Sequence, residues 1–376
     1  MDLSLNDTQL MLKKTVEDFI VRDANRDKLI ELQQTERGYS DEIWRTASEL
    51  GWVGMMIPEQ YGGGGSDFAT TAAVYEALGK GPVPGPMFSS GILCGQIILQ
   101  VGTEEQKKQY LPSIASGDIV AAFAMTEPDY QWGSVGVRLR PTESGSDYVL
   151  NGTKLFVYDG HVADWVITAV RTGDGADDIS LLMVDTKAAG VTTKKLNGFT
   201  TSESEVTFNN VKVPKANLLG GKANGIKPAL DRALMYATPI LCAYKVGGAQ
   251  AAVDMAVQYS RDRVQFGRPI GRFQFVQNHI VQAVNHLDAA RWTTNEVLWK
   301  LDTGQDARVG VHLAKTLASE GYRKACDYVH EVHAGLGIMR EYGLTLYTRG
   351  SRSLYAALGE PRYHRRQIAN LIETIE

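Results

Sequence analysis

The chain has 376 residues, which is long for a single hydrophobic core, so two or three packed units are expected. Its 44% hydrophobic and 22% charged residues are ordinary for a globular protein, and a net charge of −4 without any basic block argues against nucleic-acid binding. Cys94, Cys242 and Cys326 are far apart and have no metal-ligand spacing, so neither a zinc site nor a disulfide framework is expected. No signal-peptide pattern and no apolar run of about 20 residues is present, which predicts a cytoplasmic protein without a membrane span.

The first third of the chain, from residue 6 to about 120, is predicted to be helical. Asn6 and Thr103 are plausible N-caps for two of these helices. The glycines at 62–65 lack the Lys-Ser/Thr of a phosphate-binding loop, which favours a flexible loop over a phosphate site.

From about 120 to 215 the pattern changes to alternating apolar and polar residues. Helices do not alternate with these strands, so an antiparallel β domain is predicted, either a sandwich or a barrel. Its first strand, Phe123–Pro128, ends at a proline that lacks a backbone donor. Around Asn151-Gly152 a β-hairpin is predicted, with a second strand that continues through Val157. Taken alone, Phe123–Pro128 is a strand end and nothing more.

After Gly225 the chain is predicted to be helical to its end. The expected helices cover about 226–262, 273–303, 307–333 and 344–358, and a basic tail helix follows. The small residues of the first, among them Gly247 and Gly248, suit close packing in a bundle. The fold class is therefore α+β.

Three domains follow from this order of elements. They are an N-terminal helical domain (1–120), a middle antiparallel β domain (121–225) and a C-terminal helical bundle (226–376).

One segment between the two long helices, Arg261–Gln274, has two interpretations. Alone it is a helix-loop-helix turn with solvent-facing arginines. Together with other motifs, in this order and spacing, the segment makes the whole chain resemble the acyl-CoA dehydrogenase family. The motifs are Ile57-Pro-Glu-Gln-Tyr-Gly-Gly, Phe123-Ala-Met-Thr-Glu-Pro, Asn151-Gly-Thr-Lys, Arg263-Val-Gln-Phe-Gly-Arg-Pro-Ile, Val332-His-Ala-Gly-Leu-Gly and Leu346-Tyr-Thr-Arg.

The resemblance implies a FAD cofactor and the α,β-dehydrogenation of an acyl-CoA thioester. In that reaction a carboxylate takes the Cα proton while a hydride passes from Cβ to flavin N5. Thr126 and the backbone at Phe123 and Met125 match the strand that holds the pyrimidine side of the flavin. Phe156 matches the aromatic residue that packs on the ring, and Ser134 matches a residue at the substrate.

The resemblance also implies an assembly. Arg263, Phe266 and Gln274 match a loop that reaches the FAD pyrophosphate of a neighbouring subunit, which implies a dimer of dimers. Glu331 and Gly335 fall in the family's dinucleotide-binding segment. An electron-accepting flavoprotein is a further possible partner.

The chain departs from the family pattern at several positions. After the Thr-Glu-Pro, the small residues usual in the family are replaced by Asp129-Tyr-Gln-Trp-Gly-Ser134. Tyr158 stands where a threonine hydroxyl usually lies near flavin N5. Glu331 replaces a glutamine, and a glutamate facing a pyrophosphate would be repelled unless it is protonated or turned away.

The catalytic base is the largest departure. The family's usual glutamate position falls on Leu358, and no carboxylate occupies the other family position near Ala237 and Thr238. Glu360 is the first candidate for the base, with Tyr158 or Asp129 as a distant second choice, and a solvent-facing loop glutamate is the alternative.

Two hypotheses follow from these departures. The chain is either an active dehydrogenase with an unusual base, or a catalytically incomplete subunit. Such a subunit would complete an active site in a hetero-tetramer with a related chain, in place of a homo-tetramer.

Overall fold

The computed structural model describes residues 4–199 and 202–373, and the order of its elements confirms the predicted α+β fold. The first helices are α1 (Asp7–Asp23), α2 (Arg26–Leu32), α3 (Asp41–Glu49), α4 (Phe68–Lys80), a π-helix (Met87–Cys94), α5 (Gly95–Val101) and α6 (Glu104–Ala115). The strands that follow are β1 (Ala121–Ala124), β2 (Thr142–Ser144), β3 (Asp147–Tyr158), β4 (Trp165–Arg171), β5 (Ile179–Asp185), β6 (Val191–Lys195) and β7 (Glu203–Pro214). The last part comprises α7 (Lys227–Asp262), β8 (Val264–Gln265), β9 (Arg268–Pro269), α8 (Gln274–Asp302), α9 (Arg308–His333), α10 (Leu344–Ser353) and α11 (Pro361–Glu373).

The chain divides into two compact units, which we describe separately. The helical unit contains the residues up to Gln34, Asp67–Pro84, and those from Thr238 onward. The mixed unit contains Thr35–Ser66 and Gly85–Ala237. The three-domain division at 1–120, 121–225 and 226–376 stays a prediction.

The mixed unit contains two sheets, ordered β1-β4-β5 and β2-β3-β7-β6. Strands β4 and β5 are buried along almost their whole length, so the first sheet is covered on both faces. One pair differs from the predicted antiparallel pattern, because β1 runs parallel to β4. The chain between them passes through β2 and β3, which is long enough for the crossover that a parallel pair requires.

The hairpin predicted at Asn151-Gly152 is wrong. Strand β3 continues through both residues, and the pairing with β7 shifts register between Leu150 and Gly152. Asn151 Oδ1 accepts a hydrogen bond from the Asn210 backbone at 2.8 Å, across that irregularity. The Asn-Gly pair is thus a β-bulge, because the long partner strand β7 determines the path of the chain here rather than local turn propensity.

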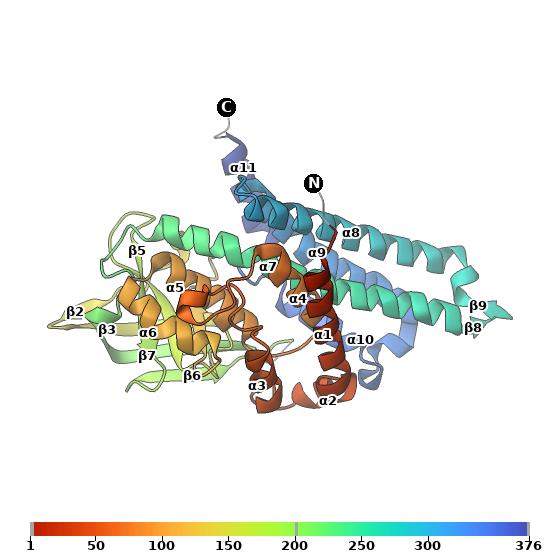
Figure 1. Cartoon of the computed structure of the whole chain (residues 1–376), viewed down its shortest axis with the longest axis horizontal. Coiled ribbons are helices and arrows are strands. Elements are labelled where there is room, and N and C mark those ends of the chain that lie inside the picture. Colours follow the sequence, from red (N-terminus) through yellow and green to blue (C-terminus); the bar gives the residue numbers. More distant parts are fainter. Residues whose placement is uncertain (1–3, 200–201, 374–376) are drawn as a thin grey trace. The chain divides into compact units, whose positions relative to one another are not determined.

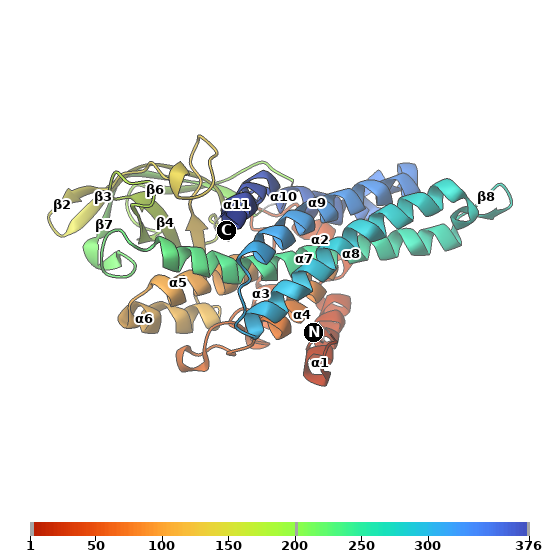
Figure 2. The ribbon, with the colours of Figure 1, turned by 90° about the horizontal axis from the view of Figure 1, so that it is seen from above.

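In the helical unit, α8 and α9 run alongside each other, next to the later part of α7 (Figures 1 and 2), and the β8–β9 hairpin joins α7 to α8. The close packing predicted from small residues is confirmed at Gly247, where an added Cβ would lie 1.9 Å from the Glu76 carbonyl oxygen. The helix predicted over 344–358 ends at Ser353, and an irregular loop leads into α11. Within the described ranges, no helix is long and apolar enough to cross a membrane.

Candidate active site

The end of β1 in the mixed unit presents unused hydrogen-bond donors. The Thr126 carbonyl accepts from the Leu155 backbone at 2.9 Å, which fixes the chain just after Phe123 and Met125. Within residues 4–199 and 202–373, the backbone N–H groups of Met125 and Thr126 and the Thr126 hydroxyl have no hydrogen-bond partner. Buried or half-buried donors are rarely left unpaired, so this strand end is suited to a ligand with acceptor atoms.

Two aromatic side chains lie beside each other near this strand end. Phe156 belongs to a second bulge of β3, between Lys154 and Val157, and has a left-handed backbone (φ 53°). Tyr130 is also left-handed (φ 60°), and the two ring centroids are 5.9 Å apart. Both side chains are exposed, Phe156 by 42% and Tyr130 by 67%. Strained backbones of this kind cost about 1–3 kcal/mol each and cluster at ligand sites, which marks the pair as a candidate stacking surface.

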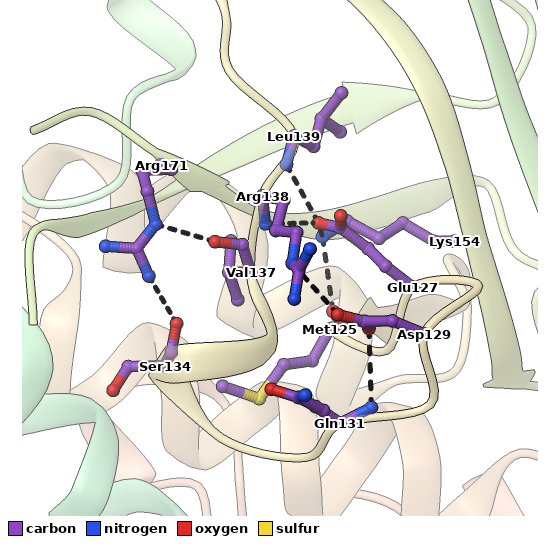
Figure 3. Close-up of polar contacts among 10 residues, drawn as sticks. All are labelled: Met125, Glu127, Asp129, Gln131, Ser134, Val137, Arg138, Leu139, Lys154 and Arg171. Atoms are coloured by element: carbon purple, nitrogen blue, oxygen red, sulfur yellow. Dashed lines mark hydrogen bonds and ion pairs between the residues drawn. The ribbon is translucent and has the colours of Figure 1, made fainter. Parts of the chain in front are cut away.

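A buried ion pair holds the backbone on both sides of Thr126 (Figure 3). Lys154, fully buried, donates to Glu127 Oε1 at 2.7 Å and to the Met125 carbonyl at 3.2 Å. The same Glu127 oxygen accepts from the backbones of Arg138 and Leu139, each at 3.0 Å. Burial lowers the pKa of Lys154 to about 8, against the opposing effect of the Glu127 carboxylate. Thr126 therefore lies between two residues, Met125 and Glu127, that one lysine holds.

The loop at Asp129–Ser134 is also held by side chains (Figure 3). Arg138 pairs with Asp129 at 2.9 Å, and Arg171 donates to the carbonyls of Val137 and Ser134. Ser134 is buried, and its hydroxyl donates to Asp177 at 3.1 Å. The hydroxyl predicted to lie at the substrate therefore already has a protein partner.

Tyr158 lies at the end of β3, where its hydroxyl donates to Glu203 at 3.1 Å. Burial raises the pKa of Tyr158 well above its usual value, and burial also raises the pKa of Glu203. The neighbouring Asp159, buried and left-handed (φ 57°), accepts from the Ser89 hydroxyl. Its burial raises the pKa of Asp159 to about 6. This buried carboxylate was not found from the sequence, because no local pattern marks it.

The residues expected at a neighbouring subunit's cofactor belong to the helical unit. Arg263, Phe266 and Gln274 are exposed in and after the β8–β9 hairpin, and Phe266 is 92% exposed on a left-handed backbone (φ 52°). Glu331, near the end of α9, and Gly335, in the short turn that follows the helix, are both exposed. An added Cβ on Gly335 would have no atom within 4 Å, so the backbone there is open to a ligand.

The candidate base Glu360 lies in the loop between α10 and α11. Its side chain is exposed and has no hydrogen bond or ion pair with any residue that the structure describes. Leu358, at the family's glutamate position, is buried and has a left-handed backbone (φ 58°). A free carboxylate thus lies two positions after Leu358, where the resemblance predicts the base.

Sequence reasoning missed the buried lysines Lys154, Lys245 and Lys315. The available signal was weak: each lies inside an apolar run or at an inward-facing strand position, where a cation is unusual. Apart from Ser319, which lies four positions after Lys315, their partners are distant in the sequence, so local patterns do not predict them.

Three family models match consecutive parts of the chain. The acyl-CoA dehydrogenase N-terminal domain matches residues 6–118, the middle domain matches 122–211 and the C-terminal domain matches 223–372.

Individual proteins are similar over almost the whole chain. A probable acyl-CoA dehydrogenase, YngJ, of Bacillus subtilis is 31% identical, over 98% of this chain and 99% of its own. The CarC subunit of the caffeyl-CoA reductase-Etf complex of Acetobacterium woodii is 29% identical, over 91% and 92%. The solved structure of butyryl-CoA dehydrogenase from Megasphaera elsdenii is 27% identical over 99% and 100%, with a TM-score of 0.89.

Proposed function

Because the chain belongs to the acyl-CoA dehydrogenase family, FAD-dependent oxidoreductases acting on acyl-CoA, we propose that it removes hydrogen from Cα and Cβ of an acyl-CoA thioester. FAD, when bound, supplies the hydride acceptor. The observation that carries the proposal is the end of β1, where unpaired donors at Met125 and Thr126 lie beside the exposed rings of Phe156 and Tyr130.

These residues fit the cofactor. A flavin has acceptor atoms on its pyrimidine edge and a flat aromatic body, which match N–H and O–H donors next to a stacking surface. Met125 and Thr126 would bind the pyrimidine edge, and Phe156 would pack on the ring. In this proposal Tyr158, whose hydroxyl donates to Glu203, lies near the flavin without presenting a free hydroxyl.

Glu360 is the proposed proton acceptor at Cα. Its carboxylate is free of protein partners within the described residues, so it is available to a substrate once the site is complete. Gly359, with φ 100°, allows the turn that places Glu360 after Leu358. The exposed hairpin with Arg263 and Phe266 would reach the FAD of a neighbouring subunit in a tetramer, and an electron-accepting flavoprotein would reoxidise the enzyme.

The first experiment is an absorption spectrum of the purified chain, with its flavin stoichiometry. About one flavin per chain, bleached by a CoA thioester, is the expected result. A chain that takes up no added FAD would contradict the proposal. Replacing Glu360 by Gln should abolish bleaching and leave the flavin bound; near-full activity of Glu360→Gln would remove Glu360 as the base.

A second candidate function is a catalytically incomplete subunit that completes an active site in a hetero-tetramer. The buried Leu358 at the usual base position favours it. In that case the chain alone would hold flavin without bleaching by any CoA thioester. Activity would appear only after a related chain is added.

A further inference from the structure

Two lysines of the helical unit are fully buried without a carboxylate partner. Lys245 of α7 is 1% exposed and Lys315 of α9 is 0% exposed. No ion pair involves either one in the part of the chain that the structure describes; both Nζ atoms instead lie near Ser319 Oγ, at 2.8 and 3.0 Å. Because a buried lysine is rarely found without a counterion, this pair calls for a physical explanation.

Lys315 contacts the loop that carries Glu360. Its Nζ donates to the Gly359 carbonyl at 2.8 Å and more weakly to the Tyr355 carbonyl at 3.4 Å. Together with Ser319 Oγ, these give three acceptors for the three donors of an ammonium group. Lys245 donates to Ser319 and also interacts with Lys315, but among the described residues it has no hydrogen bond to the loop.

The surroundings of the two amines stabilise their charged forms to different extents. Burial lowers the pKa of Lys315 to about 8 and lowers the pKa of Lys245 well below its usual value. Because Lys315 has more hydrogen-bond acceptors than Lys245, its ammonium form is the better stabilised of the two. The ammonium of Lys315 is thus directed at the loop carbonyls.

A second pair of side chains holds the same loop. His364 Nε2–H donates to the Leu358 carbonyl at 2.9 Å. His364 Nδ1 then has no proton and accepts from His312 Nδ1–H at 2.8 Å, so one choice of tautomers satisfies both contacts. Burial lowers the pKa of His364 to about 2 and that of His312 to about 4, so both rings are neutral.

The loop would not keep its shape without such contacts. Leu358 and Gly359 both have left-handed backbones, at φ 58° and 100°, and a leucine in that region is strained. Three carbonyls of this short segment, those of Tyr355, Leu358 and Gly359, accept from buried side chains of α9 and α11. Glu360 follows Gly359 directly.

We propose that Lys315 is a positioning residue for Glu360, acting through the carbonyls of Gly359 and Tyr355. The proposal rests on the proposed function, because a position for Glu360 matters to catalysis only if Glu360 is the base. Lys245 provides the matched control: it lies in the same cluster, is equally buried and bonds to the same serine, but among the described residues it has no hydrogen bond to the loop.

The test compares Lys315→Met with Lys245→Met by amide hydrogen exchange, in the flavin-loaded protein without substrate. Lys315→Met should accelerate exchange of the peptide that covers 355–360 by about tenfold or more, and Lys245→Met should leave it within about twofold of the wild type. Equal exchange of this peptide in both variants would overturn the proposal. If Lys315→Met does not fold, the double variant Lys245→Met/Lys315→Met, which has no amine in this cluster, is compared with Lys245→Met.

A kinetic measurement separates the positioning role from general destabilisation. Lys315→Met should lower kcat while KM and flavin content stay unchanged, because only the base is displaced. A loss of flavin equal to the loss of kcat would point to a merely structural role. Full activity of Glu360→Gln would show that Glu360 is not the base. The hydrogen-exchange data would still report whether Lys315 holds the loop, so a failure of the proposed base and a failure of the proposed positioning residue are distinguishable.

Discussion

Replacing Lys154 by Met should destabilise the protein strongly. The change removes the ammonium group that lies 2.7 Å from Glu127 Oε1 and leaves that carboxylate buried. Removing one partner of a buried ion pair usually costs about 3–5 kcal/mol. Glu127 still accepts from the backbones of Arg138 and Leu139, whereas the Met125 carbonyl loses a donor. We therefore expect a loss near the lower limit, about 3 kcal/mol.

The measurement is equilibrium urea unfolding of the flavin-loaded protein, followed by circular dichroism. Lys187→Met is the control, because Lys187 is 81% exposed and lies 3.7 Å from Asp164, and such surface pairs contribute about 0–1 kcal/mol. The double variant Lys154→Met/Glu127→Gln should recover part of the loss, since neither of these two positions then carries a buried charge. A Lys154→Met loss no larger than that of Lys187→Met would refute the assigned role of the pair.

Three further changes test other parts of the molecule. Arg263→Ala should weaken FAD retention by about 1.5–3 kcal/mol, the range for a hydrogen bond to a charged group, and an unchanged dissociation constant would show that the hairpin does not reach the cofactor. Gly247→Ala should cost about 1–3 kcal/mol in urea unfolding, because its Cβ would meet the Glu76 carbonyl, whereas Gly335→Ala has free space and should be near neutral. Lys245→Met should be more stable than the wild type at pH 7, and this advantage should shrink as pH rises toward 10.5. The pKa of Lys245 is lowered in the folded protein, so between that pKa and 10.5 the unfolded wild type binds more protons than the folded one. The free energy of unfolding of the wild type therefore rises with pH in this range. An advantage for Lys245→Met that grew with pH would contradict a lowered pKa of Lys245.

Much of the fold could be predicted because its signals are local. The capping boxes at Asn6 with Gln9 and at Thr103 with Gln106 involve residues three positions apart, and both predicted caps are confirmed. The change from helical to alternating patterns marked the β part for the same reason. Asn151-Gly152 shows where this reasoning ends, because pairing with β7 overrides the turn propensity of the two residues.

The candidate site was less accessible to sequence reasoning. Thr126 and Phe156 belong to motifs that could be found by resemblance, but the contacts that hold them come from elsewhere in the chain. Glu127 and Lys154 are 27 positions apart, and Lys315 and Gly359 are 44 apart. Partners at such separations are determined by tertiary packing. The residues could therefore be identified from the sequence, but their interactions could not be predicted from it.

Two buried lysines hold backbone carbonyls next to predicted site residues. Lys154 donates to the carbonyl of Met125, the residue before Thr126, and Lys315 donates to the carbonyl of Gly359, the residue before Glu360. Burial lowers the pKa of both lysines, so keeping them charged costs folding free energy. A loop that only connects two helices would be equally well held by apolar contacts at no such cost. The cost is therefore best explained if the positions of Thr126 and Glu360 matter to chemistry, which favours an active enzyme over an incomplete subunit. That preference can be tested directly: Lys315→Met should lower kcat in the chain alone, and a chain that has no activity by itself would show no kcat to lower.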